Sequence, residues 1–382
     1  MSLKQLLTIA DLKKQAKDKV PRMFFDYVDS GSWSESTYNN NEEAYKNILF
    51  SQKVLTDISQ RSTATTMIGQ KVTMPVALAP SGFAGMQYAD GEMLAVQAAN
   101  EFGVPFCLST MSICSLEDVA SVTNSPFWFQ LYMMKDRNFM QNLIERAKQV
   151  KCSALILTVD LQVLGQRHKD IKNGLSAPPK INFDSFLQFA TRPRWCWQML
   201  KTRRHSFGNI VGYAKDVSDL SSLSSWIGEQ FDPALSWNDV EWVKKLWNGP
   251  LIIKGIMRKD DAIAAVNSGA DALTVSNHGG RQLDGAPASI DLLPEIVETV
   301  GNDIEVHIDG GIRSGQDVLR ALALGAKGTY IGRPWLYGLG AAGKAGVTRA
   351  LEIIHTELDI TMGLTGKTNI KEINSDIIYF KK

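Results

Sequence analysis

Three polar side chains follow apolar runs of this sequence and have the types needed for proton transfer beside a bound carboxylate. Asp160 ends the run ALILTVD, and His278 and Arg281 lie in SNHGGRQ, directly after ALTVSN. Histidine exchanges a proton near neutral pH, and a buried aspartate can orient it and stabilise its charged form. Arginine holds a carboxylate through two parallel hydrogen bonds. A lone histidine is more often structural, but this setting favours a catalytic base and suits oxidation of a 2-hydroxy acid.

The other four histidines lack such a setting. His205, His307 and His355 follow no comparable motif, and His168 follows Arg167 in a loop. We interpret His307, which lies within an apolar run, as a satisfied core or interface residue.

Two glycine–arginine elements close together in the chain indicate an anion site. IDGGIRSG contains Asp309, Gly310, Gly311 and Arg313, and YIGR contains Gly332 and Arg333. Glycine lets a backbone approach an anion closely, main-chain N–H groups bind it, and arginine adds a charge-assisted fork. The alternative is tight turns with solvated arginines, but the coincidence of two such elements favours a phosphate site.

Lys254 stands inside the apolar run LIIKGI. A lysine in a buried strand must be paired or take part in chemistry. It could be a Schiff-base nucleophile, a partner in a structural ion pair, or a cation that stabilises an anionic cofactor. Composition alone leaves all three open.

Eight short apolar runs alternate with helix-like stretches and would position these side chains. They cover 76–80, 106–110, 127–132, 154–160, 251–256, 272–277, 305–311 and 329–333. Runs that are apolar on both faces are typical of parallel strands covered by helices, and eight βα units favour a closed (β/α)₈ TIM barrel over an open sheet. Nearly every run ends in a polar group, which is where such barrels carry their chemistry.

The remaining chain is expected to decorate one barrel domain that spans 1–382. Residues 1–70 form an N-terminal extension that begins with helices, and 165–245 form a long basic and aromatic loop insertion between strands four and five. Between 165 and 204 nine Lys or Arg stand against two Asp, and they are interleaved with Phe186, Phe189, Trp195, Trp197, Met199 and Leu200. Basic and aromatic residues in this mixture suit an anionic membrane surface, and the alternative is an active-site lid or an oligomer contact.

Composition excludes several classes of protein. The 382 residues are 44% hydrophobic and 21% charged with a formal net charge of +1, so no global field attracts nucleic acid. Four irregularly spaced cysteines predict neither disulfides nor a metal site, and they fit a reducing cytoplasm. No signal peptide is expected, and no apolar run is long enough to span a bilayer.

The motifs together resemble the FMN-dependent L-2-hydroxy-acid oxidases and dehydrogenases. PRMFFDYVDSG, VALAPSGFAGM, FQLY, LTVD, IKGI, SNHGGRQLDG, DGGIR and TGKTNIKEI occur in family order across essentially the whole chain. Within that family PFCLST, FWFQLY and NFDPALSW resemble the bacterial respiratory L-lactate dehydrogenases.

The resemblance implies a role for each matching residue. His278 would be the base and Asp160 its charge partner, with the substrate carboxylate on Arg167 and Arg281 and its hydrogen bonds from Tyr27 and Tyr132. FMN would lie over Ala79 with its ring on Ser109, Gln130 and Thr158, and Lys254 would stabilise the reduced flavin. Its ribityl and phosphate groups would bind Asp309, Gly310, Gly311, Arg313, Gly332 and Arg333.

The expected reaction is oxidation of L-lactate to pyruvate, with electrons passed to a membrane quinone or another respiratory acceptor. Met111 stands where glycolate oxidases of the family often carry tryptophan, which argues against a glycolate preference. Residues 180–205 would attach the enzyme peripherally to the cytoplasmic face of the bacterial inner membrane, and the family implies a tetramer. The alternatives are an oxidase that reduces O₂ to H₂O₂, an aldolase-like barrel with a Schiff base on Lys254, and a non-catalytic scaffold.

Overall fold

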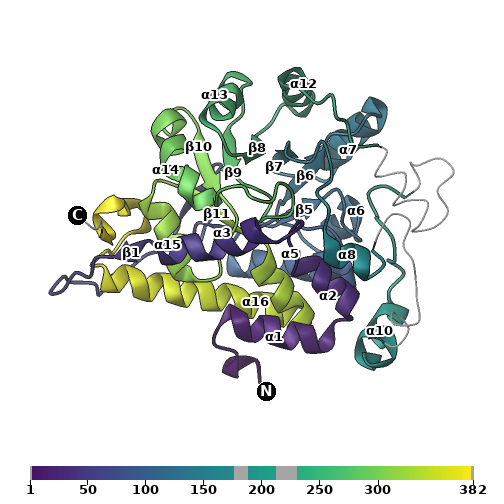
Figure 1. Ribbon diagram of the computed structural model, residues 1–382, viewed down its shortest axis with the longest axis horizontal. Coiled ribbons are helices and arrows are strands. Elements are labelled where there is room, and N and C mark those ends of the chain that lie inside the picture. Colours follow the sequence, from purple (N-terminus) through teal and green to yellow (C-terminus); the bar gives the residue numbers. More distant parts are fainter. Residues whose placement is uncertain (1, 176–187, 212–229, 380–382) are drawn as a thin grey trace.

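The computed structural model describes residues 2–175, 188–211 and 230–379, and its centre is a closed barrel of eight parallel strands (Figure 1). The strands lie in the order β4-β11-β10-β9-β8-β7-β6-β5, and a parallel bridge between Leu78 and Phe106 joins the two ends. Their bounds are β4 Val76–Leu78, β5 Cys107–Ser109, β6 Trp128–Tyr132, β7 Ala154–Thr158, β8 Leu251–Ile256, β9 Ala272–Val275, β10 Glu305–Ile308 and β11 Gly328–Ile331. All eight predicted runs contain a strand, and the TIM-barrel prediction is confirmed.

Alternate residues of each strand point into the barrel, and this alternation places the site. The inward side chains of the lower layers are apolar and form one core cluster, which includes Cys107, Trp128, Ile156 and Ile252. Because side chains alternate with period two, the next inward positions toward the carboxyl ends are Ser109, Gln130, Thr158 and Lys254. The interior is therefore largely apolar toward the amino ends of the strands, where the buried ring of His307 is an exception, and polar at the carboxyl rim.

The predicted runs extended two or three residues beyond the observed ends of several strands. Asp160, Asn277 and the Asp309–Gly311 turn all follow the last paired residue of their strand. Gly332 caps a helix that begins at Arg333, instead of ending the eighth strand. These residues belong to the loops at the rim and not to the strands. Residues with left-handed φ, such as Gly310 and Gly311, end the extended backbone conformation there.

Helices cover the outside of the barrel (Figure 1). Those that follow the strands are α4 Ala84–Gln87, α5 Gly91–Phe102, α6 Leu116–Ala120, α7 Arg137–Gln149, α12 Trp237–Trp247, α13 Lys259–Asn267, α14 Ser289–Val300, α15 Gly315–Ala323 and α16 Arg333–Leu364. The long α16 is kinked at Ala342 and Gly343, whose backbone angles are not helical.

The segment before the barrel contains helices and short strands, one of which pairs with a strand near the C-terminus. The helices are α1 Ile9–Lys19, α2 Arg22–Val28 and α3 Ser36–Lys46; β1 Leu49–Phe50 pairs with β12 Ile378–Tyr379, and β2 Thr65–Met67 pairs with β3 Gln70–Val72. The β2–β3 hairpin closes the amino end of the barrel, where Met67 and Val72 join the interior cluster. The sequence prediction missed this hairpin because four of its six strand residues are polar.

The connection between β7 and β8 contains helices α8 His168–Lys172 and α10 Pro193–Lys201 before α12. Of this connection, residues 176–187 and 212–229 lie outside the described residues, so only 188–205 of the predicted membrane segment can be placed. The described part returns to the barrel through an antiparallel bridge between Phe231 and Met134. Among the described residues, no helix combines the length and the apolar character needed to cross a bilayer.

Candidate active site

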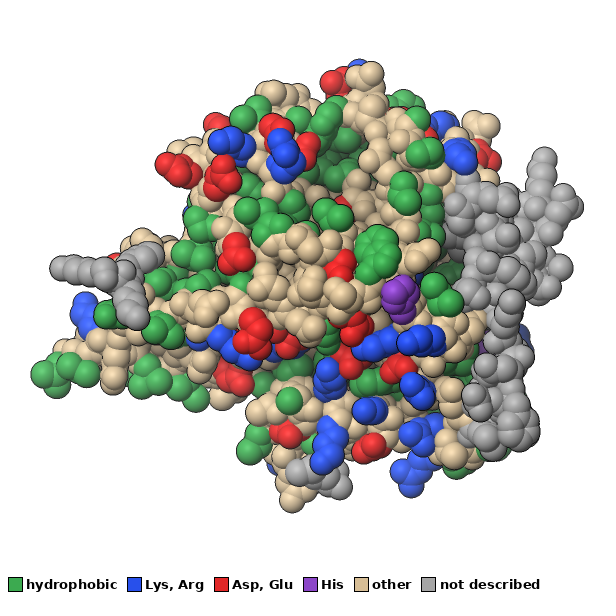
Figure 2. All heavy atoms as spheres, in the orientation of Figure 1, with side chains coloured by type: hydrophobic (Ala, Val, Ile, Leu, Met, Phe, Trp, Pro, Cys, Tyr) green, Lys and Arg blue, Asp and Glu red, His purple; other side chains and the backbone are tan. Residues whose placement is uncertain are grey.

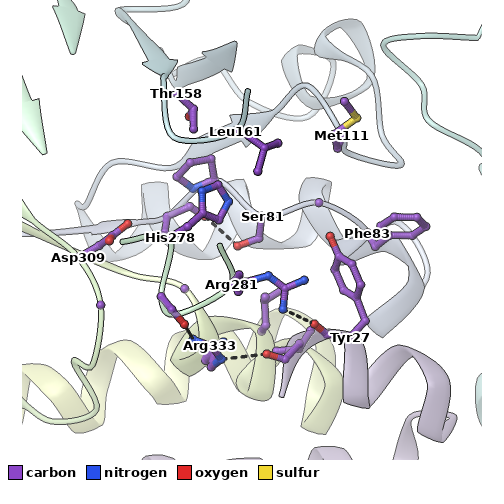
Figure 3. Close-up of a pocket in the computed structure, with 18 of the residues that line it drawn as sticks. Tyr27, Ser81, Phe83, Met111, Thr158, Leu161, His278, Arg281, Asp309 and Arg333 are labelled. Carbon is purple, nitrogen blue, oxygen red and sulfur yellow. Dashed lines mark hydrogen bonds between the residues drawn. The ribbon is translucent and has the colours of Figure 1, made fainter. Parts of the chain in front are cut away.

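A pocket opens at the carboxyl ends of the strands and gathers most of the residues singled out in the sequence (Figure 3). In Figure 3, His278, Thr158 and Arg281 surround one space, with Phe83 and Met111 along one side of it. Of the seventeen predicted site residues, only Ser109, Gln130 and Asp160 do not line the pocket, and they lie directly behind its wall. The lining residues among them are Tyr27, Ala79, Tyr132, Thr158, Arg167, Lys254, His278, Arg281, Asp309, Gly310, Gly311, Arg313, Gly332 and Arg333.

His278 and Asp160 form a hydrogen-bonded pair beside this space. Nδ1 of His278 lies 2.8 Å from Oδ1 of Asp160, and both side chains are largely buried. Burial alone would raise the pKa of Asp160, but the charge of His278 and its hydrogen bond outweigh burial and lower it. The aspartate therefore stays charged at neutral pH, and it leaves Nε2 of His278 as the free end of the ring.

Local backbone geometry fixes this pair. His278 has a left-handed φ of 59°, and its N–H donates to the Ser276 hydroxyl at 3.1 Å. Gln282 donates to the Asp160 carbonyl at 2.9 Å. Gly255 has a φ of 114°, and a Cβ there would lie 2.8 Å from the Asp160 Cβ, so any other residue would displace the aspartate.

Two arginines meet over the ring of Tyr27. The guanidinium of Arg281 lies 4.7 Å and that of Arg167 5.7 Å from the ring centre. Arg281 donates to the Tyr27 carbonyl at 2.6 Å, whereas its other terminal nitrogen is buried without a partner. Burial, and then the positive charge of Arg167, lower the pKa of Arg281 to about 10. The site is short of negative charge, and a carboxylate would supply it.

Lys254 is an ion-pair partner and not a free amine. Its side chain is 6% exposed, and Nζ lies 3.0 Å from Asp309 Oδ2 and 2.9 Å from the Ser276 hydroxyl. Burial alone would lower the pKa of Lys254, but the charges of Asp309 and Asp160 outweigh it and raise the pKa. A Schiff-base lysine needs a lowered pKa, so this environment disfavours the aldolase alternative.

Several buried polar atoms around the pocket have no partner within the described chain. The Ser109 hydroxyl donates to the side-chain oxygen Oε1 of Gln130 at 2.9 Å, and Nε2 of the same amide is unsatisfied. Thr158 Oγ1 and Asp309 Oδ1 are unsatisfied as well. Because buried polar groups are normally paired, these atoms indicate a polar ligand. A flat ring with carbonyl and imino groups, followed by a polyol chain, would satisfy them, so the donor set fits FMN.

The glycine–arginine elements form a cradle at one end of the pocket. Gly310 and Gly311 have φ of 93° and 83°, and a Cβ on Gly311 would lie 1.9 Å from the Asn41 carbonyl oxygen. The guanidinium of Arg333 is held by the carbonyls of Val28, Gly279 and Ser30, and that of Arg313 by Glu42. Both arginines are thus fixed before any anion arrives.

The sequence prediction missed much of the apolar wall. Phe83, Phe207 and Phe231 line the pocket, and the rings of Tyr27, Phe83 and Phe207 form a ladder with centroid distances of 5.0 and 4.6 Å. Phe83 lies in VALAPSGFAGM, directly after the first strand, and could have been singled out there. Phe207 and Phe231 arrive from the insertion and have no periodic signal.

Comparisons with known proteins agree with this geometry. Residues 16–380 match the FMN-dependent dehydrogenase family. The chain is 44% identical to the L-lactate dehydrogenase of Actinobacillus pleuropneumoniae serotype 5b and 43% identical to that of a Caulobacter species, in each case over 96% of this chain and 97% of the relative. Its fold is similar to that of a monotopic membrane protein, (S)-mandelate dehydrogenase, with a TM-score of 0.94 and 32% identity over 99% of this chain and 100% of that one. The chain belongs to the FMN-dependent dehydrogenase family, and its cofactor is FMN.

Proposed function

We propose that the protein oxidises L-lactate to pyruvate and passes the electrons to a quinone in the membrane. The observation that carries this proposal is the meeting of the His278–Asp160 pair with the unsatisfied guanidinium nitrogen of Arg281 in one pocket. A base, its charge partner and a carboxylate clamp are the groups that oxidation of a 2-hydroxy acid requires.

In this proposal Arg281 and Arg167 bind the substrate carboxylate, and the hydroxyls of Tyr27 and Tyr132 form hydrogen bonds with the substrate. His278 Nε2 takes one proton, and the charge of Asp160 stabilises the imidazolium that results. Bound FMN supplies the acceptor for the two electrons. A hydride route and a carbanion route both leave one proton on His278, so the residue has the same role in either.

The proposed cofactor contacts follow the inward face of the strands. Ala79, Ser109, Gln130 and Thr158 would hold the ring, and Lys254 would stabilise negative charge near it. The sugar-alcohol chain and phosphate would bind the cradle formed by Asp309, Gly310, Gly311, Arg313, Gly332 and Arg333. The unsatisfied atoms of Gln130, Thr158 and Asp309 support this arrangement.

The apolar wall favours a short substrate side chain. Phe83 and Phe207 are interlocked edge to face, and Met111 lies beside them in the lining. The relatives named L-lactate dehydrogenase support lactate as the substrate, whereas the structural neighbour is an (S)-mandelate dehydrogenase. We expect kcat/KM to be at least about tenfold higher for L-lactate than for (S)-mandelate, a ratio within reach of one apolar pocket.

Peripheral attachment to the cytoplasmic face of the inner membrane is part of this proposal. On α10 the side chains of Trp197 and Leu200 are 61% and 79% exposed, and Val163, Ile171 and Val211 of the same connection are also exposed. The structural neighbour is itself a monotopic membrane protein. Replacing Trp197 and Leu200 with serine should release the enzyme from membranes with its flavin intact.

The visible absorption spectrum before and after anaerobic substrate tests the reaction. Flavin bands that bleach with L-lactate and persist with D-lactate are the expected result, and subsequent addition of a quinone and of air ranks the acceptors. A flavin that stays oxidised with L-lactate would contradict the proposed substrate. Reoxidation by air that is faster than by quinone would favour the oxidase.

A further inference from the structure

A second pocket lies outside the catalytic site, where the end of α1, the start of α10 and the kink of α16 meet, and the two pockets share no lining residue. Its lining includes three cations, Lys19, Arg192 and Arg194, and one acid, Asp18. Lys19 Nζ donates at 2.5 Å to the Ala341 carbonyl, at the kink of α16. Figure 2 shows Lys and Arg side chains gathered in the lower part of the face, where α1 lies in Figure 1.

These three cations lack charge partners. Within the described chain, no carboxylate lies within salt-bridge distance of Lys19, Arg192 or Arg194. Arg192 reaches only the backbone carbonyls of Thr191 and Lys17, at 3.2 and 3.4 Å, and its Nε is buried without any partner. Burial, and then the charge of Arg194, lower the pKa of Lys19. Lys19 and Arg194 are exposed and Arg192 is half-buried, so the buried Nε of Arg192 is the donor that lacks a partner, and an anion between the three cations would supply one.

The start of α10 adds main-chain donors to the same pocket. No side chain caps this nine-residue helix, and its first residues line the pocket; Pro193 has no N–H, so the donors there are the N–H groups of Arg194 and Trp195. The first N–H groups of a helix have no partner within it and carry the positive end of the helix dipole. Combined with the charges of Arg192 and Arg194, such an end suits a phosphate group.

An apolar surface adjoins the pocket. Trp197 and Leu200 follow Arg194 by one and two turns of α10 and point into solvent, and Lys201 lies 4.8 Å from the Trp197 ring centre. The opposite side of α10 packs against α2, where Trp195 stacks on Phe24. A phosphate site beside exposed apolar side chains fits a molecule with an anionic head and a hydrocarbon tail better than it fits a free anion.

We propose that this pocket binds the phosphate of an anionic phospholipid, with the acyl chains over Trp197 and Leu200. The inference rests on the peripheral attachment proposed above and adds a specific headgroup site to it. It predicts that the enzyme distinguishes lipids by headgroup even where diffuse attraction is screened.

Co-sedimentation of the FMN-loaded enzyme with vesicles tests the proposal. We would compare phosphatidylcholine vesicles with vesicles that contain phosphatidylglycerol, at about 0.5 M salt, because salt largely screens exposed charges that lie more than a Debye length apart and affects charges in direct contact less. The variant Arg192→Gln/Arg194→Gln removes two pocket charges. The matched control Lys201→Gln/Arg203→Gln removes two exposed charges at the other end of α10, outside the pocket.

We expect the wild type and the control to bind vesicles with phosphatidylglycerol about 30-fold more tightly than phosphatidylcholine vesicles, because each of the two arginine charges contributes about fivefold in affinity. The pocket variant should lose this preference. An unchanged flavin spectrum and melting temperature would show that the variants are folded. Equal binding of the wild type to both vesicles, or a pocket variant that keeps the preference, would overturn the proposal. So would calorimetric binding of glycerol phosphate without any lipid preference, which would assign the site to a soluble phosphate ester.

Two further measurements distinguish failure of the headgroup site from failure of the proposals on which it rests. Binding to neutral vesicles reports the peripheral attachment, and anaerobic bleaching by L-lactate reports the proposed reaction. The pocket variant should leave both unchanged.

Discussion

Replacing Asp160 with asparagine isolates the charge that the proposed base depends on. The Asp160 carboxylate lies 2.8 Å from His278 Nδ1, and an asparagine of the same shape can still accept that hydrogen bond. The Gln282 contact to the Asp160 backbone does not depend on the side chain and should survive. The substitution therefore changes the charge beside the imidazole with little change in its position.

The expected loss follows from the charge interaction. Two unit charges about 4 Å apart near a protein surface interact by about 4 kcal/mol. This stabilisation is absent while His278 is neutral and present once it has taken the substrate proton, so it acts on the rate. About 4 kcal/mol corresponds to roughly a 10³-fold slower flavin reduction. Because the pKa of Asp160 is lowered, its charge is lost only in acid, and the deficit should be constant across neutral pH.

Stopped-flow absorbance under anaerobic conditions measures the rate, and the chain offers a matched control. His307 and Glu305 form a second histidine–carboxylate pair, 3.1 Å apart, at the other end of the barrel. Glu305→Gln removes the same charge beside a histidine without touching the pocket. It should reduce its flavin within about twofold of the wild-type rate, a change worth only about 0.4 kcal/mol.

Two results would refute this reasoning. Flavin reduction by Asp160→Asn within about fivefold of the wild type would mean that the pair contributes no more than about 1 kcal/mol to the step. An equal loss in Glu305→Gln would mean that the effect comes from general destabilisation.

Three further perturbations follow from the same geometry. Lys254→Met leaves Asp309 buried without its partner, so we expect about 3–5 kcal/mol lower unfolding free energy in urea and weaker FMN retention; an unchanged stability would contradict the ion pair's role. Gly311→Ala places a Cβ 1.9 Å from the Asn41 carbonyl oxygen at a left-handed φ, so purified protein should contain little flavin, and full flavin content would count against the cradle. Because Arg281 carries its charge only below a pKa of about 10, KM for L-lactate should rise as pH increases through 10, with the flavin spectrum as the control for folding; a flat KM would argue that the clamp lies elsewhere.

Strand periodicity made much of the site predictable. Once a run such as ALILTVD is assigned to a parallel strand, Thr158 falls on the same face as Ile156, and Asp160 falls just beyond the end. The sequence therefore predicted which side chains share the carboxyl rim. It could not predict their distances, which depend on backbone features such as the left-handed His278 and the close approach of Gly255 to Asp160.

Strand periodicity did not predict the pocket residues that come from the connection between β7 and β8. Phe207 is placed over the pocket because Asn209 bonds to Leu116 N and to Ser112 Oγ, and Phe231 because its backbone pairs with Met134. Neither contact has a local pattern, since both join segments that are at least about 90 residues apart in the chain. Local propensity and period describe neighbours along the chain, whereas these walls depend on tertiary contact.

The two histidine–carboxylate pairs show what strand direction adds to residue type. His307 is the third residue of β10, and its ring lies inside the barrel, bonded to Tyr330 and to Glu305 of its own strand. His278 stands three residues beyond the end of β9 and faces the pocket. Both rings have a carboxylate partner, so chemistry alone does not separate them. In a barrel whose strands all run the same way, the groups at and just beyond the carboxyl ends of the strands meet at one rim, whereas a group farther back in a strand, such as His307, meets the core. Position relative to the end of the strand is therefore what marks His278, and not His307, as the proposed base.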